Sequence, residues 1–339
     1  MIALTGGGTG GHLAIVRALK NALNQRGIQP IYIGSTNGQD RAWFEHETGF
    51  SEKFFLNSQG VVNKKGWKKL TSLGEILNTS RQCKKIFKRY HVTDLVSVGG
   101  YSAAPASFAT LTSHVKLYIH EQNAAMGKLN KILKPFATEF FSSYDPHSKI
   151  KDYPVDTAFF TKRKPIKKLE TIIFLGGSQG AKAINTLAMQ LAKKLSENNI
   201  HIIHQCGKNN LEEMLQFYHD NHINADVFDF DPQLREKILQ ADFAISRSGA
   251  STLWELCALG VPSLFIPYPY AASDHQYYNA KALVDEDLAL LRRESEVDSH
   301  AIYESIMMLD LQHISTKLKQ HIAPNGAEKI IDFIINHHT

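Results

Sequence analysis

The stretch that decides the fold is MIALTGGGTGGH, residues 1–12, in which a short apolar run ends in a glycine-rich turn and a helical pattern follows. A second turn of this kind, FLGGSQGA, occupies residues 174–181. A glycine turn between a strand and a helix presents unpaired backbone N–H groups at the helix N-terminus, where phosphate binds well. Two such turns, far apart in the chain, predict two α/β lobes that share an anionic ligand.

Short apolar, β-branched runs alternate with helical stretches along the whole chain. We predict strands at residues 2–5, 30–33, 95–98, 116–119, 172–175, 200–205, 243–246 and 263–266. This alternation is typical of parallel sheets with helices on both faces. The basic stretch KRKPIKK, residues 162–168, is the natural linker. The predicted domains are therefore 1–160 and 169–324, with a final helix at 325–339 that packs back on the first domain.

The composition is that of an ordinary globular protein. Hydrophobic residues make up 43% and charged residues 21% of the 339 residues, a length that fits two domains of usual size. No apolar run is long enough to cross a bilayer, and the N-terminus lacks a signal-peptide pattern. The three cysteines stand alone, without metal-ligand or redox spacing, so we expect buried thiols in a reducing compartment and a cytoplasmic protein.

The net charge of +5 is unevenly distributed, with a basic excess between residues 61 and 90. Trp67 lies there beside Lys64, Lys65 and Lys68, next to a turn at Gly66. One interpretation is a solvated basic helix whose apolar face is core. The other is contact with an anionic lipid surface, where each cation contributes about 1 kcal/mol. Nucleic acid is not expected as a partner, because no binding motif or pattern of stacking aromatics accompanies the charge.

The first turn formally matches the dinucleotide fingerprint Gly-x-Gly-x-x-Gly at residues 6–11. A nicotinamide or flavin enzyme normally carries an acid at the end of the second strand, where it binds the ribose hydroxyls. Here that strand ends in GSTN, residues 34–37, so the acid is missing. Neither turn ends in the Gly-Lys-Ser/Thr of a nucleoside triphosphatase. Thr9 and His12 either cap the helix and face solvent, or bring hydroxyl and imidazole chemistry to the mouth of the turn.

A third block, SRSGASTLWE at residues 246–255, follows a predicted strand and opens a helix. Its backbone N–H groups and hydroxyls suit a diphosphate, and Glu255 lies within reach of a ribose diol. The alternative is that Ser251 and Thr252 are helix caps and that Glu255 balances the helix dipole. The segment PYPY, residues 267–270, then leads into His275 and Gln276, which we interpret as a specificity loop at the carboxyl edge of a sheet.

These segments together resemble the MurG family of glycosyltransferases, family 28. The matching stretches are GGTGGH (7–12), GGY (99–101), HEQN (120–123), GGSQGA (176–181), the block at 246–255 and DHQ (274–276), in the order of the family. The resemblance implies the GT-B fold. That fold consists of two Rossmann-like, doubly wound parallel-sheet α/β domains facing a cleft, with the sugar donor held mainly by the second domain.

The resemblance also implies roles for individual residues. Thr9, Gly10 and Gly11 would approach the donor diphosphate or the acceptor pyrophosphate, and Tyr101 would lie on the acceptor side. The other implied contacts are those of Asn123, His275 and Gln276 with the sugar, Ser178 with the diphosphate, Ala250, Ser251 and Thr252 with the phosphate and ribose, and Glu255 with the ribose hydroxyls. Trp67 and its lysines would dock on the membrane that holds the lipid-linked acceptor.

The implied reaction is an inverting transfer of N-acetylglucosamine from UDP-N-acetylglucosamine to the C4 hydroxyl of the muramyl unit of undecaprenyl-diphospho-MurNAc-pentapeptide, in peptidoglycan synthesis. His12 is the candidate general base, because imidazole titrates in the working pH range, and Glu121 is the reserve. No cluster of metal ligands occurs in the sequence, so no tightly bound metal is expected, although Mg²⁺ could assist the free diphosphate. The enzyme would be a peripheral protein on the cytoplasmic face of the bacterial inner membrane.

One departure from the family concerns its Asn-Pro-Val-Arg segment near the interdomain hinge, whose arginine binds the donor phosphates. This chain has YPVD at residues 153–156. An aspartate cannot take that role, so Arg163, Lys162 or Arg247 is the hypothesised substitute. Three rival functions stay open: a UDP-sugar 2-epimerase, a catalytically silent lipid-binding subunit, and a transferase that makes glycolipids from diacylglycerol. The segment 120–123 and Gln276 favour the MurG-type function over the last of these.

Overall fold

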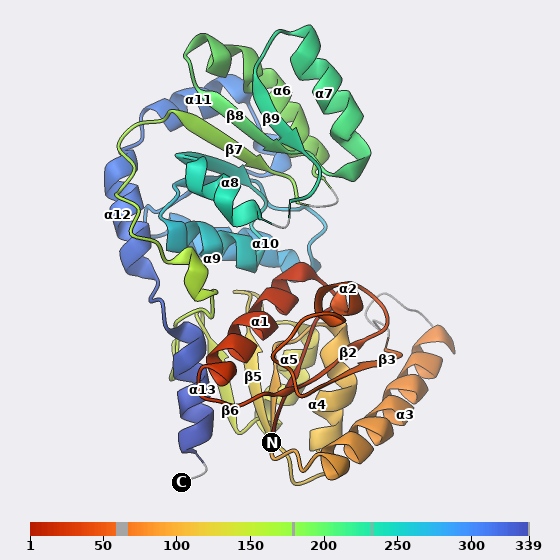
Figure 1. Cartoon of the computed structure of the whole chain (residues 1–339). Coiled ribbons are helices and arrows are strands. Elements are labelled where there is room, and N and C mark those ends of the chain that lie inside the picture. The colour runs from red at the N-terminus through yellow and green to blue at the C-terminus, as the bar shows by residue number, and fades with distance from the viewer. Residues whose placement is uncertain (59–66, 178–179, 232, 338–339) are drawn as a thin grey trace. The chain divides into compact units, whose positions relative to one another are not determined.

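The computed structural model describes residues 1–58, 67–177, 180–231 and 233–337, and within these ranges the side chains of residues 67–74 stay outside the description. The chain divides into two compact units, and Figure 1 shows a sheet with flanking helices in each. Unit 1 consists of Met1–Thr157 together with Pro324–Thr339, and unit 2 is Ala158–Ala323. Of the predicted site residues, Lys64, Lys65 and Ser178 lie outside the described residues, as do the side chains of Trp67 and Lys68.

Unit 1 is built on a parallel sheet that has six strands among the described residues, in the order β3-β2-β1-β4-β5-β6. The strands are β1 (Ile2–Thr5), β2 (Ile31–Ser35), β3 (Glu52–Leu56), β4 (Asp94–Ser97), β5 (Lys116–Glu121) and β6 (Glu139–Ser142). β1 lies in the middle, where Leu4 pairs with Tyr32 of β2 and Val96 of β4. Because the strands are parallel, the loops that follow their carboxyl ends open at one edge of the sheet.

Unit 2 repeats this plan, with the strand order β12-β11-β10-β7-β8-β9 in its described part. The strands are β7 (Thr171–Leu175), β8 (His201–Gln205), β9 (Ala225–Phe228), β10 (Phe243–Ser246), β11 (Ser263–Phe265) and β12 (Leu290–Leu291). Counted from its own first strand, unit 2 has the same strand order as unit 1, which is the order of dinucleotide-binding folds. The predicted class, two doubly wound parallel-sheet α/β domains, is confirmed.

Helices flank both sheets. In unit 1 they are α1 (Gly10–Asn24), α2 (Asp40–Phe44), α3 (Trp67–Arg89), α4 (Ala104–Thr110), α5 (Lys128–Leu133) and α13 (Gly326–Asn336). In unit 2 they are α6 (Lys182–Glu197), α7 (Leu211–Asp220), α8 (Leu234–Gln240), α9 (Ala250–Leu259), α10 (His275–Val284), α11 (Ser299–Met307) and α12 (Leu311–His321). No helix in the described ranges is both long and apolar enough to cross a bilayer. Cys83, Cys206 and Cys257 are free and buried, as predicted.

Four strands of the structure are missing from the sequence prediction, namely β3, β6, β9 and β12. Each of them is an edge strand of its sheet. An edge strand pairs on one side only, so it is shorter or less completely buried than its inner neighbours, and its sequence lacks their continuous apolar run. β12 has two residues, and all four residues of β9 are only half-buried.

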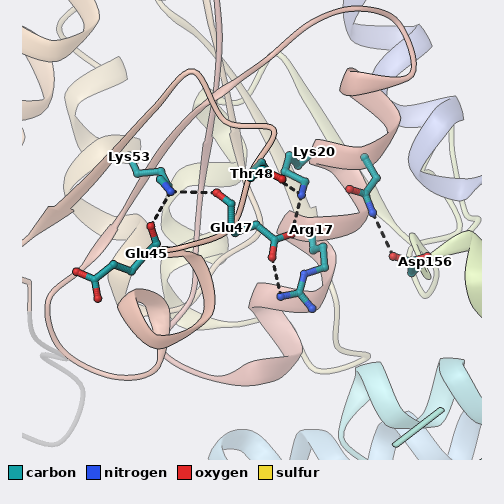
Figure 2. A network of polar contacts seen from close by, with 8 residues as sticks. Arg17, Lys20, Glu45, Glu47, Thr48, Lys53 and Asp156 are labelled. Carbon is teal, nitrogen blue, oxygen red and sulfur yellow. Dashed lines mark hydrogen bonds and ion pairs between the residues drawn. The ribbon is translucent and has the colours of Figure 1, made fainter. Parts of the chain in front are cut away.

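The helix that follows the first glycine turn is fixed by buried polar contacts as well as by its apolar face. Figure 2 shows Lys20, which is 5% exposed, donating to the Glu47 carboxylate at 2.6 Å and to the Thr48 carbonyl at 3.1 Å. Arg17 pairs with the same carboxylate at 3.2 Å. These contacts bind α1, which begins at the glycine turn, to the segment between α2 and β3.

The C-terminal helix α13 packs against α1 within unit 1, and Figure 1 shows the two side by side. Arg26, just after α1, donates from Nε and Nη2 to the two oxygens of Asp332, at 2.6 and 2.7 Å. Three isoleucines of α13 are completely buried: Ile330, Ile331 and Ile334. Unit 1 is therefore completed by residues from the far end of the chain.

Candidate active site

Three loops of unit 1 meet at the carboxyl edge of its sheet. The glycine turn after β1 is joined to the loop after β4 by a hydrogen bond from the Gly7 N–H to the Gly99 carbonyl, at 3.3 Å. The loop after β5 reaches the same turn through His12, whose Nε2 lies 2.8 Å from the side-chain nitrogen of Gln122. The structure thus brings the predicted residues Thr9, Gly10, Gly11, His12, Tyr101 and Asn123 to one edge.

His12 is held at both ring nitrogens. Its Nδ1 lies 2.9 Å from the Thr9 hydroxyl, and its Nε2 faces Gln122. When the amide nitrogen of Gln122 donates to Nε2, the ring proton lies on Nδ1 and is donated to Thr9. Thr9 makes no capping hydrogen bond to α1, so its hydroxyl orients His12 and does not cap the helix. His12 is half-buried and Thr9 is exposed, which leaves the Nδ1 side nearer to solvent.

Glu121 is buried and turned into its own loop. One carboxylate oxygen accepts the Asn123 N–H at 2.9 Å. The other accepts the Gly127 N–H at 2.8 Å and the Asn130 side-chain amide at 2.9 Å. A carboxylate that accepts from several points of one loop fixes the path of that loop, and here the loop carries Asn123. The use of Glu121 as the reserve base stays a prediction.

In unit 2, a buried network supports the second glycine turn, of which residues 178–179 lie outside the description. The Gly176 N–H donates to the Gln205 carbonyl at 3.1 Å. Asn185 donates to the Cys206 carbonyl at 3.1 Å, and its side-chain oxygen lies 3.1 Å from Nε2 of His204. Burial lowers the pKa of His204 to about 4, so this histidine is neutral at physiological pH.

The N-terminus of α9 is suited to bind an anion. Its N-cap residue, Gly249, supplies no side-chain cap. Ser251 donates to the Glu255 carboxylate at 2.8 Å, so it orients Glu255 and is not the cap either. The hydroxyl of Ser248 is completely buried and has no hydrogen-bond partner among the described residues. The first N–H groups of α9 offer donors at the positive end of the helix dipole.

Arg247 fixes the loop that follows β11. Its Nη1 donates to the carbonyls of Ile266 and Pro267, at 2.9 and 3.0 Å, and its Nη2 pairs with Glu294 at 2.5 Å. The same loop is closed by the Tyr268 N–H, which donates to the side-chain oxygen of Gln276 at 2.9 Å. The adjacent His275 has its Nδ1 2.9 Å from the Ala272 carbonyl. The predicted specificity loop therefore has a defined shape, and Gln276 and His275 lie at its end.

The structure argues against one of the three hypothesised substitutes for the missing phosphate-binding arginine, namely Arg163. Arg163 pairs with Asp242 at 2.9 Å, and Asp242 accepts the Thr171 N–H at the start of β7. Arg163 therefore lies at the amino edge of the sheet, opposite the turns, and cannot bind a phosphate there. Arg247 is bonded to the loop carbonyls and to Glu294. Asp156, which stands where the family has its arginine, accepts a hydrogen bond from the side-chain amide of Asn21 in α1 at 3.2 Å (Figure 2). Lys162, which is exposed, stays a hypothesis.

Asp40 is a site residue that the sequence prediction missed. It is completely buried, and its carboxylate accepts the Gly8 N–H of the first glycine turn at 2.6 Å. The sequence prediction sought an acid directly at the end of β2 and found none. The acid stands at the first position of α2 instead, and it binds the protein's own turn in place of a ribose. No local pattern marks Asp40, because its partner Gly8 lies 32 positions earlier in the chain.

Comparison with known proteins identifies the family. Residues 2–142 match the glycosyltransferase family 28 N-terminal domain, and residues 171–333 match the glycosyltransferase family 28 C-terminal domain. The chain belongs to glycosyltransferase family 28. It is 54% identical over 330 residues to the UDP-N-acetylglucosamine--N-acetylmuramyl-(pentapeptide) pyrophosphoryl-undecaprenol N-acetylglucosamine transferase of Campylobacter jejuni, an alignment that covers 97% of this chain and 96% of the relative. The protein of the same name from Campylobacter fetus is 51% identical over 335 residues, with 99% of both chains covered.

Solved structures of family 28 and of other sugar-nucleotide enzymes have the same fold. The crystal structure of MurG from Acinetobacter baumannii superposes with a TM-score of 0.80 at 26% identity and covers 99% of each chain. The UDP-GlcNAc 2-epimerase from Neisseria meningitidis, bound to UDP-GlcNAc, has a TM-score of 0.67 at 10% identity, covering 99% of this chain and 98% of its own. The second likeness shows the fold alone. The predicted resemblance to the MurG glycosyltransferases is confirmed.

Proposed function

We propose that the chain transfers N-acetylglucosamine from UDP-N-acetylglucosamine to the C4 hydroxyl of the muramyl unit of undecaprenyl-diphospho-MurNAc-pentapeptide, with inversion at the anomeric carbon. This step converts lipid I to lipid II in peptidoglycan synthesis. The observation that carries the proposal is the identity of 51–54%, over 97–99% of this chain, to relatives named for that transfer. Three structural features support it: the two glycine turns, the start of α9 without a side-chain cap, and the hydrogen bonds that orient His12.

Unit 2 would bind the donor. The UDP diphosphate accepts from the first N–H groups of α9. Glu255, which Ser251 orients, accepts from the ribose hydroxyls. Gln276 and His275 face the N-acetylglucosamine. As the glycosidic bond to UDP breaks, negative charge grows on the diphosphate, and fixed donors at a helix N-terminus stabilise that charge without having to reorganise.

Unit 1 would bind the acceptor and supply the base. The N–H groups of Thr9, Gly10 and Gly11 donate to the acceptor pyrophosphate or to the donor diphosphate, while Tyr101 and Asn123 border the same edge. His12 takes the proton of the attacking hydroxyl, which requires a lone pair on Nδ1, the ring nitrogen beside Thr9, and a proton on Nε2. A half-turn of the Gln122 amide supports that tautomer, because it would pair Nε2–H with the Gln122 oxygen, which is otherwise buried without a partner in the described part of the chain.

The assay is transfer of labelled N-acetylglucosamine from UDP-N-acetylglucosamine to a short-chain analogue of the lipid-linked muramyl-pentapeptide. UDP-glucose serves as the competing donor. Turnover with a strong preference for the N-acetylated donor is expected, and loss of about 100-fold or more in kcat is expected for His12→Ala. Wild-type rates in His12→Ala would remove His12 as the base. Donor binding without turnover would favour an epimerase or a diacylglycerol-dependent glycolipid transferase, each of which is then assayed with its own substrate.

Transfer is proposed to need no tightly bound metal. Among the described residues, no group of three or more His, Cys, Asp or Glu side chains could hold a metal ion. The fixed donors at α9 take the part that a metal would have at the diphosphate. Extensive dialysis against EDTA should therefore leave the rate unchanged, and added Mg²⁺ should act, if at all, in proportion to its binding to free diphosphate. A stoichiometric requirement for a metal would contradict this.

The enzyme is proposed to dock as a peripheral protein on the cytoplasmic face of the inner membrane, through unit 1. Ile132 of α5 is 57% exposed, and Phe136, four residues on, is 62% exposed. The exposed Lys128, Lys131 and Lys134 lie along the same segment. Two exposed apolar side chains among cations suit an anionic bilayer surface. Co-sedimentation with phosphatidylglycerol vesicles should fall in the double variant Ile132→Ser, Phe136→Ser. It should not fall in Leu215→Ser, which removes an exposed apolar residue of α7.

A further inference from the structure

The first glycine turn carries a buried carboxylate beneath it. Asp40 is completely buried, and one of its oxygens accepts the Gly8 N–H at 2.6 Å. The other accepts the Ser35 N–H at 2.9 Å and the Tyr32 hydroxyl at 3.0 Å. The Gly8 and Ser35 N–H groups can only donate, so each carboxylate oxygen accepts one backbone hydrogen bond, while the single proton of Tyr32 is shared between Asp40 and the Gly6 carbonyl, 2.9 Å from the Tyr32 oxygen.

The opposite side of Gly8 is closed by an aromatic ring. A Cβ added to Gly8 would overlap the ring of Tyr101, and the backbone φ of +85° is itself a conformation that favours glycine. A Cβ at Gly38, whose φ is +82°, would overlap the Tyr101 hydroxyl and approach Gly8. Burial, and then the charge of Asp40, raise the pKa of Tyr101. Asp40 and the Tyr101 ring therefore both restrict the backbone conformation of Gly8.

This arrangement changes what the turn can bind. A dinucleotide-binding turn presents the N–H groups of its glycines to a pyrophosphate. Here the N–H of Gly8 already has an acceptor, and a phosphate close to it would meet the negative charge of Asp40. The next N–H groups, those of Thr9, Gly10 and Gly11, belong to the first turn of α1, where no partner within the helix is available. They also lie beside His12, which Thr9 orients.

We propose that Asp40 is a positioning residue that fixes Gly8 and confines a substrate diphosphate to the N–H groups of residues 9–11, next to His12. The assignment of a diphosphate substrate rests on the proposed function. Two diphosphates are available, one in the sugar nucleotide and one in the lipid-linked acceptor, and both have the chemistry that these N–H groups recognise. The position on the turn then sets how the substrate lies against the imidazole.

Amide hydrogen exchange of the full-length protein tests the position without relying on turnover. In the wild type, exchange at Gly8 should be slow, and inorganic pyrophosphate should slow Thr9, Gly10 and Gly11 while leaving Gly8 unchanged. In Asp40→Asn, an NH₂ group replaces one of the two accepting oxygens, so exchange at Gly8 should accelerate and pyrophosphate protection at residues 9–11 should be lost. Pyrophosphate protection that extends to Gly8 in the wild type, or unchanged exchange in the variant, would overturn the proposal.

The KM values of the two substrates then show which diphosphate binds at the turn, and a control variant shows whether the effect is merely structural. Asp40→Asn should raise KM about 10-fold or more for one diphosphate substrate, with the other KM unchanged, and the affected substrate identifies the source. Tyr32→Phe keeps the contact between Asp40 and Gly8, so both KM values should stay close to those of the wild type. The control is Asp94→Asn, a carboxylate of 1% exposure at the start of β4, away from the turns. Equal KM changes in Asp94→Asn would refute a role of Asp40 in positioning. Absence of turnover in the wild type would refute the proposed function and leave the exchange test to decide this inference.

Discussion

At the scale of single residues, His120 makes the stability of unit 1 depend on pH. Its side chain is 1% exposed, and neither ring nitrogen has a hydrogen-bond partner among the described residues. The ring packs edge-on against Tyr153, with centroids 5.5 Å apart. Burial, and to a lesser extent the charge of His12, lowers the pKa of His120 to about 3. The folded protein therefore binds this proton far less readily than the unfolded chain.

The first prediction concerns acid unfolding of unit 1. Because the folded pKa of His120 lies below its unfolded value of about 6.5, its contribution to stability is complete above pH 6.5. That contribution is lost as pH falls toward 3, by about 1.4 kcal/mol per pH unit. Urea midpoints measured between pH 7 and pH 4 should fall less steeply in His120→Phe than in the wild type. Equal slopes would show that His120 is solvated or protonated in the folded state. His204 of unit 2 remains in both proteins and is the internal reference.

Glu121 gives a second prediction at this scale, since a positioning carboxylate and a base respond differently to Glu121→Gln. The amide turns an NH₂ group toward donors of its own loop, which costs about 1–3 kcal/mol for a buried group left unsatisfied. We expect a lower melting temperature, a higher KM for the acceptor, and a pH–rate profile with unchanged limbs. Disappearance of the limb that reports the base, at wild-type stability, would instead identify Glu121 as that base. Asp94→Asn is again the matched control.

At the scale of elements, the inner strands and both glycine turns could be predicted from sequence because each is a local pattern. Strands covered on both faces are continuous apolar runs, as Ile172 to Leu175 of β7 are. The edge strands are not: β3 reads EKFFL and has no fully buried residue. The four missed strands follow from that difference. The glycine turns are recognisable because turn and strand adjoin in sequence.

The parts of the site that could not be predicted depend on partners far apart in the chain. Asp40 meets Gly8 across 32 positions, and Arg163 meets Asp242 across 79. The sequence could not show that Arg163 lies at the amino edge of unit 2, because its pairing with Asp242 exists only once the sheet has formed. The spacing of Thr9 and His12 is local, and even there the contact of the Thr9 hydroxyl with the ring, in place of a helix cap, needed the structure.

The third prediction belongs to the α1–α13 pair, where two kinds of contact can be compared. Ile334 is completely buried, so Ile334→Ala should cost about 2–5 kcal/mol in the free energy of unfolding of unit 1. Arg26→Ala removes a fork to Asp332, whose side chain is 53% exposed, and should cost about 1 kcal/mol or less. Urea unfolding followed by a probe in unit 1 measures both. A larger loss from Arg26→Ala than from Ile334→Ala would mean that the charge pair, and not the apolar face, holds α13.

At the scale of the whole molecule, unit 2 is an insertion into unit 1. The chain completes most of unit 1, builds all of unit 2, and returns with residues 324–339 to finish unit 1. Each unit has its own parallel sheet and its own buried apolar residues. Cutting the chain at the two ends of unit 2 should affect the two units unequally. Residues 158–323 keep every strand of their sheet, whereas residues 1–157 lose the helix that covers α1.

The last prediction follows from that inequality. Residues 158–323 expressed alone should unfold cooperatively, and UDP-N-acetylglucosamine at about 100 times its Kd should stabilise them by about 2.7 kcal/mol, as it should the full chain. The reason is that the start of α9 and Glu255, the proposed donor contacts, both belong to this unit. Residues 1–157 alone should show a lower melting temperature than unit 1 in the full chain, because Ile330, Ile331 and Ile334 are missing. Calorimetry with and without the sugar nucleotide measures both. A folded unit 2 that the sugar nucleotide does not stabilise would mean that donor binding needs residues of unit 1, and the donor roles proposed for α9 would then be incomplete.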